Sequence, residues 1–122
     1  MTNETKTRQI EPDITVVEIS GRLNLGNVLQ TLEASIRRMI DEGARKLIID
    51  VSTLTYIDSA GIGVLVGCRG RIAQRDGHLR IVGAQGPVAR TFELVHMNLI
   101  APLDADLESA CRHLSDGGTT AV

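Results

Sequence analysis

The sequence alternates short, β-branched apolar segments with longer segments of helical periodicity, and this alternation restricts the possible folds more than any other feature. Residues 13–19 (DITVVEI), bounded by Pro12 and a Ser-Gly pair, predict a strand. Residues 46–51 (KLIIDV) form a continuous apolar run that is typical of a strand buried on both faces. Residues 78–82 (HLRIV) predict a further strand, and residues 6–10 a weaker one.

The segments between these strands have the spacing of amphipathic helices. Apolar residues recur every three or four positions over residues 28–40, where Asn24 or Asn27 is available as the N-terminal cap and Gly43 as the stop. A second helix is predicted to begin at Ser59. Strands that alternate with helices in this way indicate an α/β protein with crossover connections.

The last third of the chain predicts two more helices. One begins near Pro87 and presents Val88, Phe92 and Val95 on one side. A possible short strand follows at residues 98–101, and Asp104 is the predicted cap of a last helix. The expected architecture is therefore a single α/β domain with a mixed four- to five-stranded sheet and about four helices.

Composition excludes several classes of function. The chain has 13 Lys and Arg against 15 Asp and Glu, so it lacks the basic excess that nucleic-acid binding requires. No apolar run reaches the roughly 18 residues of a membrane-spanning helix, and the polar N-terminus does not resemble a signal peptide, so we expect a cytoplasmic protein without membrane insertion. Cys68 and Cys111 lack metal-ligand or redox spacing, and we expect free thiols, no metal and no cofactor.

The segment with the most chemical information is residues 56–63 (YIDSAGIG), which lies between a buried strand and the second predicted helix. A helix N-terminus offers unpaired N–H groups and the positive end of the helix dipole, so a phosphate on Ser59 would be accommodated there. The competing interpretation is that Asp58 or Ser59 is only an N-cap, a common role for both residue types. Local chemistry alone favours the cap.

Three segments occur in a characteristic order: residues 21–24 (GRLN), 47–51 (LIIDV) and 57–65 (IDSAGIGVL). Together they resemble the STAS-domain anti-anti-sigma factors, also called anti-sigma factor antagonists, of bacterial sporulation and general stress response. The resemblance implies one STAS domain over residues 1–114. Residues 115–122, at the end of the chain, are expected to form a flexible tail.

In that family, a protein kinase that is itself the anti-sigma factor phosphorylates the serine after the aspartate, which is Ser59 here. The resemblance implies that the unphosphorylated chain binds the anti-sigma factor and releases the sigma factor. Phosphorylation at Ser59 would switch this binding off, because added negative charge beside Asp58 brings repulsion and a desolvation cost to a docked interface. A PP2C-type phosphatase is the implied partner that removes the phosphate.

The resemblance also implies a partner-binding surface around the motif. Its expected residues are Asn24, Asp58, Ser59, Ala60, Gly61, Ile62 and Val64. The chain departs from the family in two places. Ala60 stands where Ser or Thr is frequent, and Arg22 and Asn24 stand in a turn that is usually acidic, which changes the charge that a kinase would meet.

Three glycines of the second predicted helix, Gly63, Gly67 and Gly70, share one helical face, although glycine costs about 0.5–1 kcal/mol relative to alanine in a helix. We expect close packing against a neighbouring element of the same domain to compensate, and close approach of a partner is the alternative.

Two other functions are considered. A serine hydrolase is disfavoured because Ile57 stands where the Gly-x-Ser-x-Gly motif needs its first glycine. The stronger alternative is a STAS interaction subunit of a lipid-transport or stress-sensing complex, in which Ser59 would dock without being phosphorylated.

Overall fold

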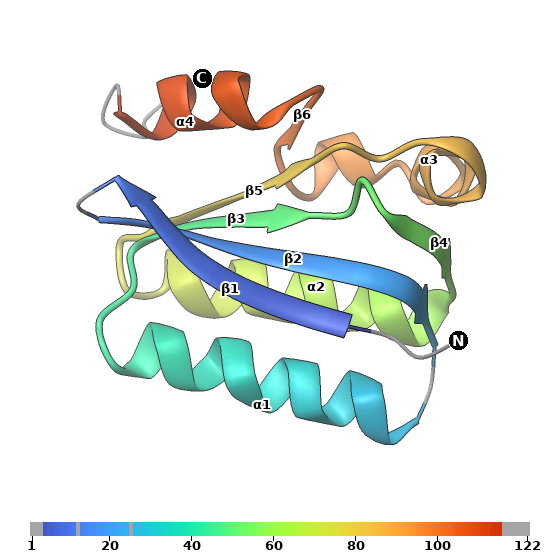
Figure 1. The fold of residues 1–122 in the computed structure, drawn as a ribbon, viewed down its shortest axis with the longest axis horizontal. Helices are drawn as coiled ribbons and strands as arrows, with labels where there is room; N and C mark the ends of the chain where they lie inside the picture. Colours follow the sequence, from blue (N-terminus) through green and yellow to red (C-terminus); the bar gives the residue numbers. More distant parts are fainter. Residues whose placement is uncertain (1–3, 12, 25, 116–122) are drawn as a thin grey trace.

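The computed structural model describes residues 4–11, 13–24 and 26–115, and within these residues helices cover both faces of a six-stranded sheet (Figure 1). In chain order the elements are β1 (Glu4–Glu11), β2 (Ile14–Leu23), α1 (Asn27–Asp41), β3 (Lys46–Asp50), β4 (Leu54–Ile57), α2 (Ser59–Ala73), β5 (His78–Val82), α3 (Gly86–Leu94), the 3₁₀ helix η1 (Met97–Leu99), β6 (Leu103–Asp104) and α4 (Leu107–Ser115). The α/β class and the mixed sheet are confirmed.

The sheet is parallel except at β1, which forms an antiparallel pair with β2. The strand order is β1-β2-β3-β5-β6. β2 is long enough to pair with two strands on the same side: residues 14–18 pair with β3, and residues 21–23 pair with β4. Because β2 to β6 run in the same direction, the loops that follow their carboxyl ends lie along one edge of the sheet.

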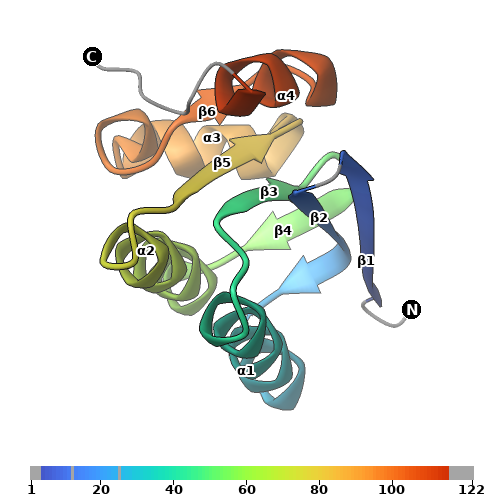
Figure 2. The same cartoon turned by 90° about the vertical axis from the view of Figure 1, so that its left-hand side faces the viewer.

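The central strands are buried on both faces, as the apolar run at residues 46–51 predicts. Ile49 contributes to a core shared with α1, α2 and α3, while the adjacent Ile48 contributes to a second core shared with α4. This follows from the two-residue period of a strand, which sends successive side chains to opposite faces. Figure 2 shows α1 and α2 on one side of the sheet and α3 and α4 on the other.

Two details of the predicted sheet are wrong. The sequence predicts no strand between residue 51 and the second helix, but residues 54–57 form β4, with Leu54 and Ile57 buried and Thr55 exposed. Residues 98–101 were expected to be a strand, but they fall at η1 and the turn after it, and the last strand is β6. Both β4 and β6 are too short for periodicity to identify, and pairing with neighbouring strands creates them.

The predicted caps also differ from the observed ones. Gly26, with φ 152°, is the N-cap of α1, and neither Asn24 nor Asn27 occupies that position. Asp104 belongs to β6, while Asp106 accepts a hydrogen bond from the backbone N–H of Ser109 in the first turn of α4 (2.9 Å).

Other boundaries also changed. Val95 is exposed, so it does not extend the buried side of α3. Ser115, assigned to the predicted tail, is the last residue of α4, and residues 116–122 lie outside the described part of the chain, so their flexibility stays a prediction. None of the helices in the described residues has the length and apolar character to cross a bilayer.

Candidate functional site

Asp58 and Ser59 lie where β4 passes into α2, at the carboxyl edge of the sheet. The backbone N–H of Asp58 donates to the carbonyl of Leu23 at the end of β2 (3.2 Å), and the Asp58 carboxylate accepts from the backbone N–H of Gly61 (3.0 Å). Asp58 is therefore the N-cap of α2. Ser59 follows as the first residue of the helix, and it is exposed.

Gly61 allows this turn to pack closely under the end of β2. A Cβ atom at Gly61 would lie 2.7 Å from Cγ1 of Ile57 and 2.9 Å from the carbonyl oxygen of Leu23. The backbone oxygen cannot move away without breaking the sheet, so only glycine fits. The motif glycine thus holds the start of α2, and Ser59 with it, at a fixed place relative to β2.

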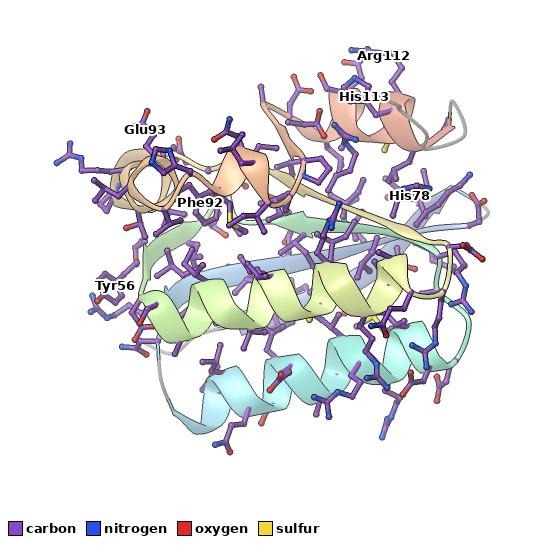
Figure 3. The ribbon with its side chains drawn as sticks, turned by 180° about the vertical axis from the view of Figure 1, so that it is seen from behind. Tyr56, His78, Phe92, Glu93, Arg112 and His113 are labelled. Atoms are coloured by element: carbon purple, nitrogen blue, oxygen red, sulfur yellow. The ribbon has the colours of Figure 1, made fainter. Side chains whose placement is uncertain are left out.

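The strand pair that leads into the site carries a cation–π contact that sequence reasoning missed. Arg22 and Tyr56 are directly opposite each other on β2 and β4, and the guanidinium carbon lies 4.2 Å from the ring centroid. Figure 3 shows Tyr56 at this end of the sheet. Arg22, which the resemblance marks as a departure from an acidic turn, therefore contacts the strand that presents Ser59.

The neighbouring loop at the same edge is held by side-chain hydrogen bonds. The carboxylate of Asp50 accepts from the backbone N–H (2.9 Å) and the hydroxyl (2.7 Å) of Ser52. The side-chain amide of Gln85, in the loop after β5, donates to the carbonyl of Ser52 (2.7 Å). The loops on this side of Ser59 are therefore tied together before any partner binds.

The predicted partner-binding residues do not all reach the surface. Asn24, Asp58 and Ala60 are half-buried. Ile62 and Val64 are each 9% exposed and belong to the core shared with α1 and α2. The structure therefore brings these residues together around Ser59 but gives Ile62 and Val64 a packing role, and their contact with a partner stays a prediction.

The outer face of α2 does not pack against the rest of the described chain. A Cβ atom at Gly63, Gly67 or Gly70 would have nothing within 4 Å, apart from the helix's own backbone. The expectation that internal packing compensates for these glycines is therefore wrong. With Ser59, they leave an outer helix face with few side-chain atoms.

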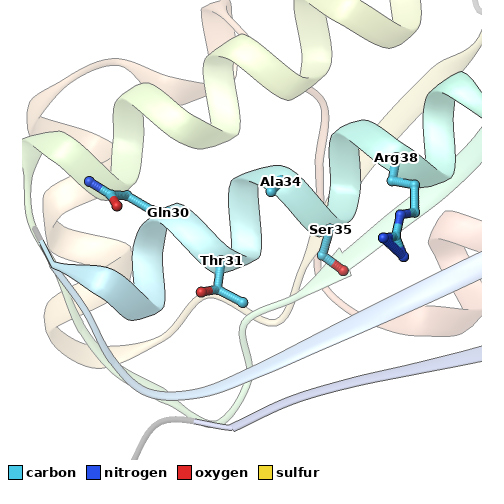
Figure 4. Close-up of a pocket in the computed structure, with 5 residues that line it drawn as sticks. All are labelled: Gln30, Thr31, Ala34, Ser35 and Arg38. Carbon is cyan, nitrogen blue, oxygen red and sulfur yellow. The ribbon is translucent and has the colours of Figure 1, made fainter.

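A separate surface groove of about 550 Å³ is lined by α1 alone, through Gln30, Thr31, Ala34, Ser35 and Arg38 (Figure 4). It includes none of the motif residues. Among the described residues, no group of three or more His, Cys, Asp or Glu side chains is arranged to hold a metal ion. The candidate site is the surface around the exposed Ser59 hydroxyl.

Comparisons with known proteins agree with this geometry. Residues 5–110 match the STAS domain family. The anti-sigma-B factor antagonist of Staphylococcus aureus is 31% identical over 88 residues, which cover 67% of this chain and 81% of that protein. The crystal structure of an anti-sigma factor antagonist from Mycobacterium paratuberculosis matches with a TM-score of 0.77 at 24% identity, covering 91% of this chain and 92% of that one.

The anti-sigma factor antagonist SpoIIAA in its unphosphorylated form has the same fold, with a TM-score of 0.75 at 17% identity and coverage of 93% of this chain and 99% of that one. The phosphorylated form of this Bacillus protein matches with a TM-score of 0.71. From the matched residues and the shared architecture, this chain belongs to the STAS domain family.

Proposed function

We propose that this chain is a cytoplasmic anti-sigma factor antagonist that is switched by phosphorylation of Ser59. Its unphosphorylated form binds an anti-sigma factor that is also a serine kinase and thereby releases the sigma factor; a PP2C-type phosphatase restores the binding form. The observation that carries the proposal is the exposed Ser59 at the first position of a 15-residue helix whose cap is already supplied by Asp58.

The division of roles between Asp58 and Ser59 supports a switch. Because the Asp58 carboxylate caps the helix, the Ser59 hydroxyl is not needed for that role and can be modified without unfolding the first turn. A phosphate on Ser59 adds about −1.5 to −2 charge next to the Asp58 carboxylate. Free at the surface, that charge is solvated and favoured by the helix dipole, but under a docked partner it is desolvated and repelled.

The exposed glycine face of α2 supports the proposal that the partner contacts this side of the helix. Since nothing in the described chain lies near Gly63 or Gly67, a partner could approach the helix backbone closely there. The turn at residues 21–24 adjoins this face through the hydrogen bond from Asp58 to Leu23. A local switch is sufficient, because typical coupling free energies of about 1–3 kcal/mol change affinity by one to two orders of magnitude.

Phosphorylation is tested directly by incubating the chain with its cognate kinase and ATP. We expect intact-mass analysis to show one added phosphate on the wild type and none on Ser59→Ala. Equal phosphorylation of Ser59→Ala would refute the assignment. Analysis of the protein purified from its own host then tests the alternative, since a Ser59 that is never phosphorylated there favours a STAS interaction subunit.

The switch itself is tested by calorimetry with the kinase. Ser59→Asp should bind about tenfold or more weakly, because a carboxylate supplies part of the phosphate's repulsion, whereas Ser59→Ala should bind like the wild type. Ser35→Asp is a matched control, since Ser35 is also exposed but lies on α1 in the separate groove. If Ser59→Asp is folded and binds the kinase as tightly as the wild type does, the electrostatic switch is contradicted.

A further inference from the structure

The end of α3 and η1 expose an apolar patch that the proposed function does not use. Of the large apolar side chains that are exposed in the described residues, three of four lie here: Leu94 (74% exposed), Val95 (39%) and Leu99 (79%). The fourth, Val28, lies on α1. Single exposed apolar residues are normal, but three of them within six residues of a small domain are typical of an interaction surface.

The backbone holds this patch in place. His96 has φ 55°, a left-handed conformation that non-glycine residues adopt rarely. Its N–H donates to the carbonyl of Glu93 (3.1 Å), and its own carbonyl accepts from the N–H of Leu99 (3.0 Å). With Met97 fully buried beneath this turn, Leu94 and Leu99 are presented outward from a fixed scaffold.

Charged residues of opposite sign flank the patch on the same helix. Arg90 and Glu93 are exposed on α3, three residues apart, and neither forms an ion pair within the described chain. Figure 3 shows Glu93 pointing away from the sheet and Phe92 pointing toward it. One surface thus offers an apolar centre with one unpaired positive and one unpaired negative charge beside it.

We propose that this α3–η1 patch is a self-association interface, and that its occupant is the same patch of a second copy of this chain. In a two-fold contact, every residue pair occurs twice, so Arg90 of one copy can pair with Glu93 of the other and Glu93 with Arg90. Leu94 and Leu99 of both copies then exclude water at the centre. The self-complementary charges favour a second copy over a partner with a charged surface of one sign.

The dimer is expected to be reversible and independent of the phosphorylation site. A patch of three apolar residues for each copy is small, and small interfaces form transient complexes. α2 and α3 lie on opposite sides of the sheet (Figures 1 and 2). α3 packs against β4 through its buried side, with Val88 and Phe92, whereas Leu94 and Leu99 are exposed. Association through this patch therefore uses other side chains than a contact through the outer face of α2.

Sedimentation equilibrium of the purified full chain over a range of concentrations tests the proposal. We expect a monomer–dimer equilibrium in the wild type. The dimer dissociation constant should rise about tenfold or more in Leu94→Glu, because each copy then buries a carboxylate in the apolar contact. Val28→Glu is the matched control and should dimerise like the wild type. Because Leu94 is largely exposed, the variant should keep the wild-type unfolding midpoint and remain a kinase substrate.

A charge exchange tests the pairing across the two-fold axis. Arg90→Glu alone and Glu93→Arg alone should each weaken the dimer at low salt, and the double variant should restore it, since the opposite charges meet again. The proposal is overturned by a wild type that stays monomeric, by a dimer unaffected by Leu94→Glu, by equal weakening in Val28→Glu, or by a double variant that does not recover.

Discussion

Two glycines of α2 with opposite surroundings lead to opposite predictions. Gly61→Ala should lower the free energy of unfolding by about 1–3 kcal/mol, because its Cβ would overlap Ile57 and the carbonyl of Leu23. Gly67→Ala should raise it by about 0.5–1 kcal/mol, because its Cβ meets nothing and alanine favours the helix. Urea unfolding measures both values, and a Gly61→Ala variant as stable as the wild type would contradict the close contact.

Gly67→Ala also tests the partner surface. If the kinase approaches the backbone of α2, a methyl group at this position should weaken binding even though it stabilises the helix. Unchanged affinity together with higher stability would show that the glycine face is not part of the contact.

Cys68 differs from Cys111 in its environment. Cys68 lies in the core, and burial, reinforced by the negative charge of Glu33, raises the pKa of its thiol from 9.0 to about 11. Cys111 is half-buried. Since the thiolate is the reactive form, iodoacetamide should modify Cys111 before Cys68 in the folded protein at neutral pH, as peptide mapping would show. Faster modification of Cys68 would contradict its burial.

The raised pKa of Cys68 also affects stability. The folded state favours the protonated thiol of Cys68. The contribution of this thiol to the free energy of unfolding is therefore complete below pH 9.0 and is lost as the pH rises toward about 11. The free energy of unfolding should therefore decline more over this pH range in the wild type than in Cys68→Ala. The variant lacks this thiol but keeps all the other titrating groups. Parallel declines would contradict the shift.

At the scale of the elements, Asp104 links three segments of the chain. Its carboxylate is 4% exposed and accepts from Nε and Nη2 of Arg80 on β5, the latter at 3.3 Å, while Nδ1 of His113 on α4 lies at 2.9 Å. The sequence indicated Asp104 as a helix cap, but the fold uses it to join β6, β5 and α4. This explains how a two-residue strand keeps its place at the sheet edge.

Asp104→Asn should therefore lower the free energy of unfolding by about 3–5 kcal/mol, because it leaves the largely buried guanidinium of Arg80 without a counter-charge. Asp13→Asn is the comparison. Asp13 is 61% exposed and pairs with Lys46 at 3.0 Å, so its loss should cost about 1 kcal/mol or less. Urea unfolding of both variants checks the difference. Similar losses of unfolding free energy would show that the ion pair of Asp104 contributes no more than one at the surface.

At the scale of the whole molecule, the sheet separates two surfaces, with α1 and α2 on one side and α3 and α4 on the other (Figure 2). If the kinase binds around Ser59, amide exchange in the complex should slow at residues 21–24 and in the first half of α2, and not in α4. Ser59→Asp at the same concentrations should show a weaker version of the same pattern. Protection found only in α4 would place the partner on the opposite side of the sheet.

The sequence by itself determined the elements whose information is local. β2, β3, β5 and the helices α1 and α2 follow from apolar periodicity within single segments, because burying one face of a helix or both faces of a strand requires those patterns. The position of Ser59 at a helix start is also local, because Asp58 is a frequent N-cap residue and the apolar periodicity of the second helix begins after it. The family resemblance rested on these same segments.

Only the tertiary structure decided the features that depend on contacts between distant segments. Leu54 to Ile57 become a strand because the end of β2 is free to pair with them, and Asp104 finds Arg80 and His113 instead of capping a helix. The burial of Ile62 and Val64, and the empty space outside Gly67, depend on where α1 packs against α2. Periodicity shows that a helix has an apolar face, but the neighbouring elements decide which residues that face buries and which remain for a partner.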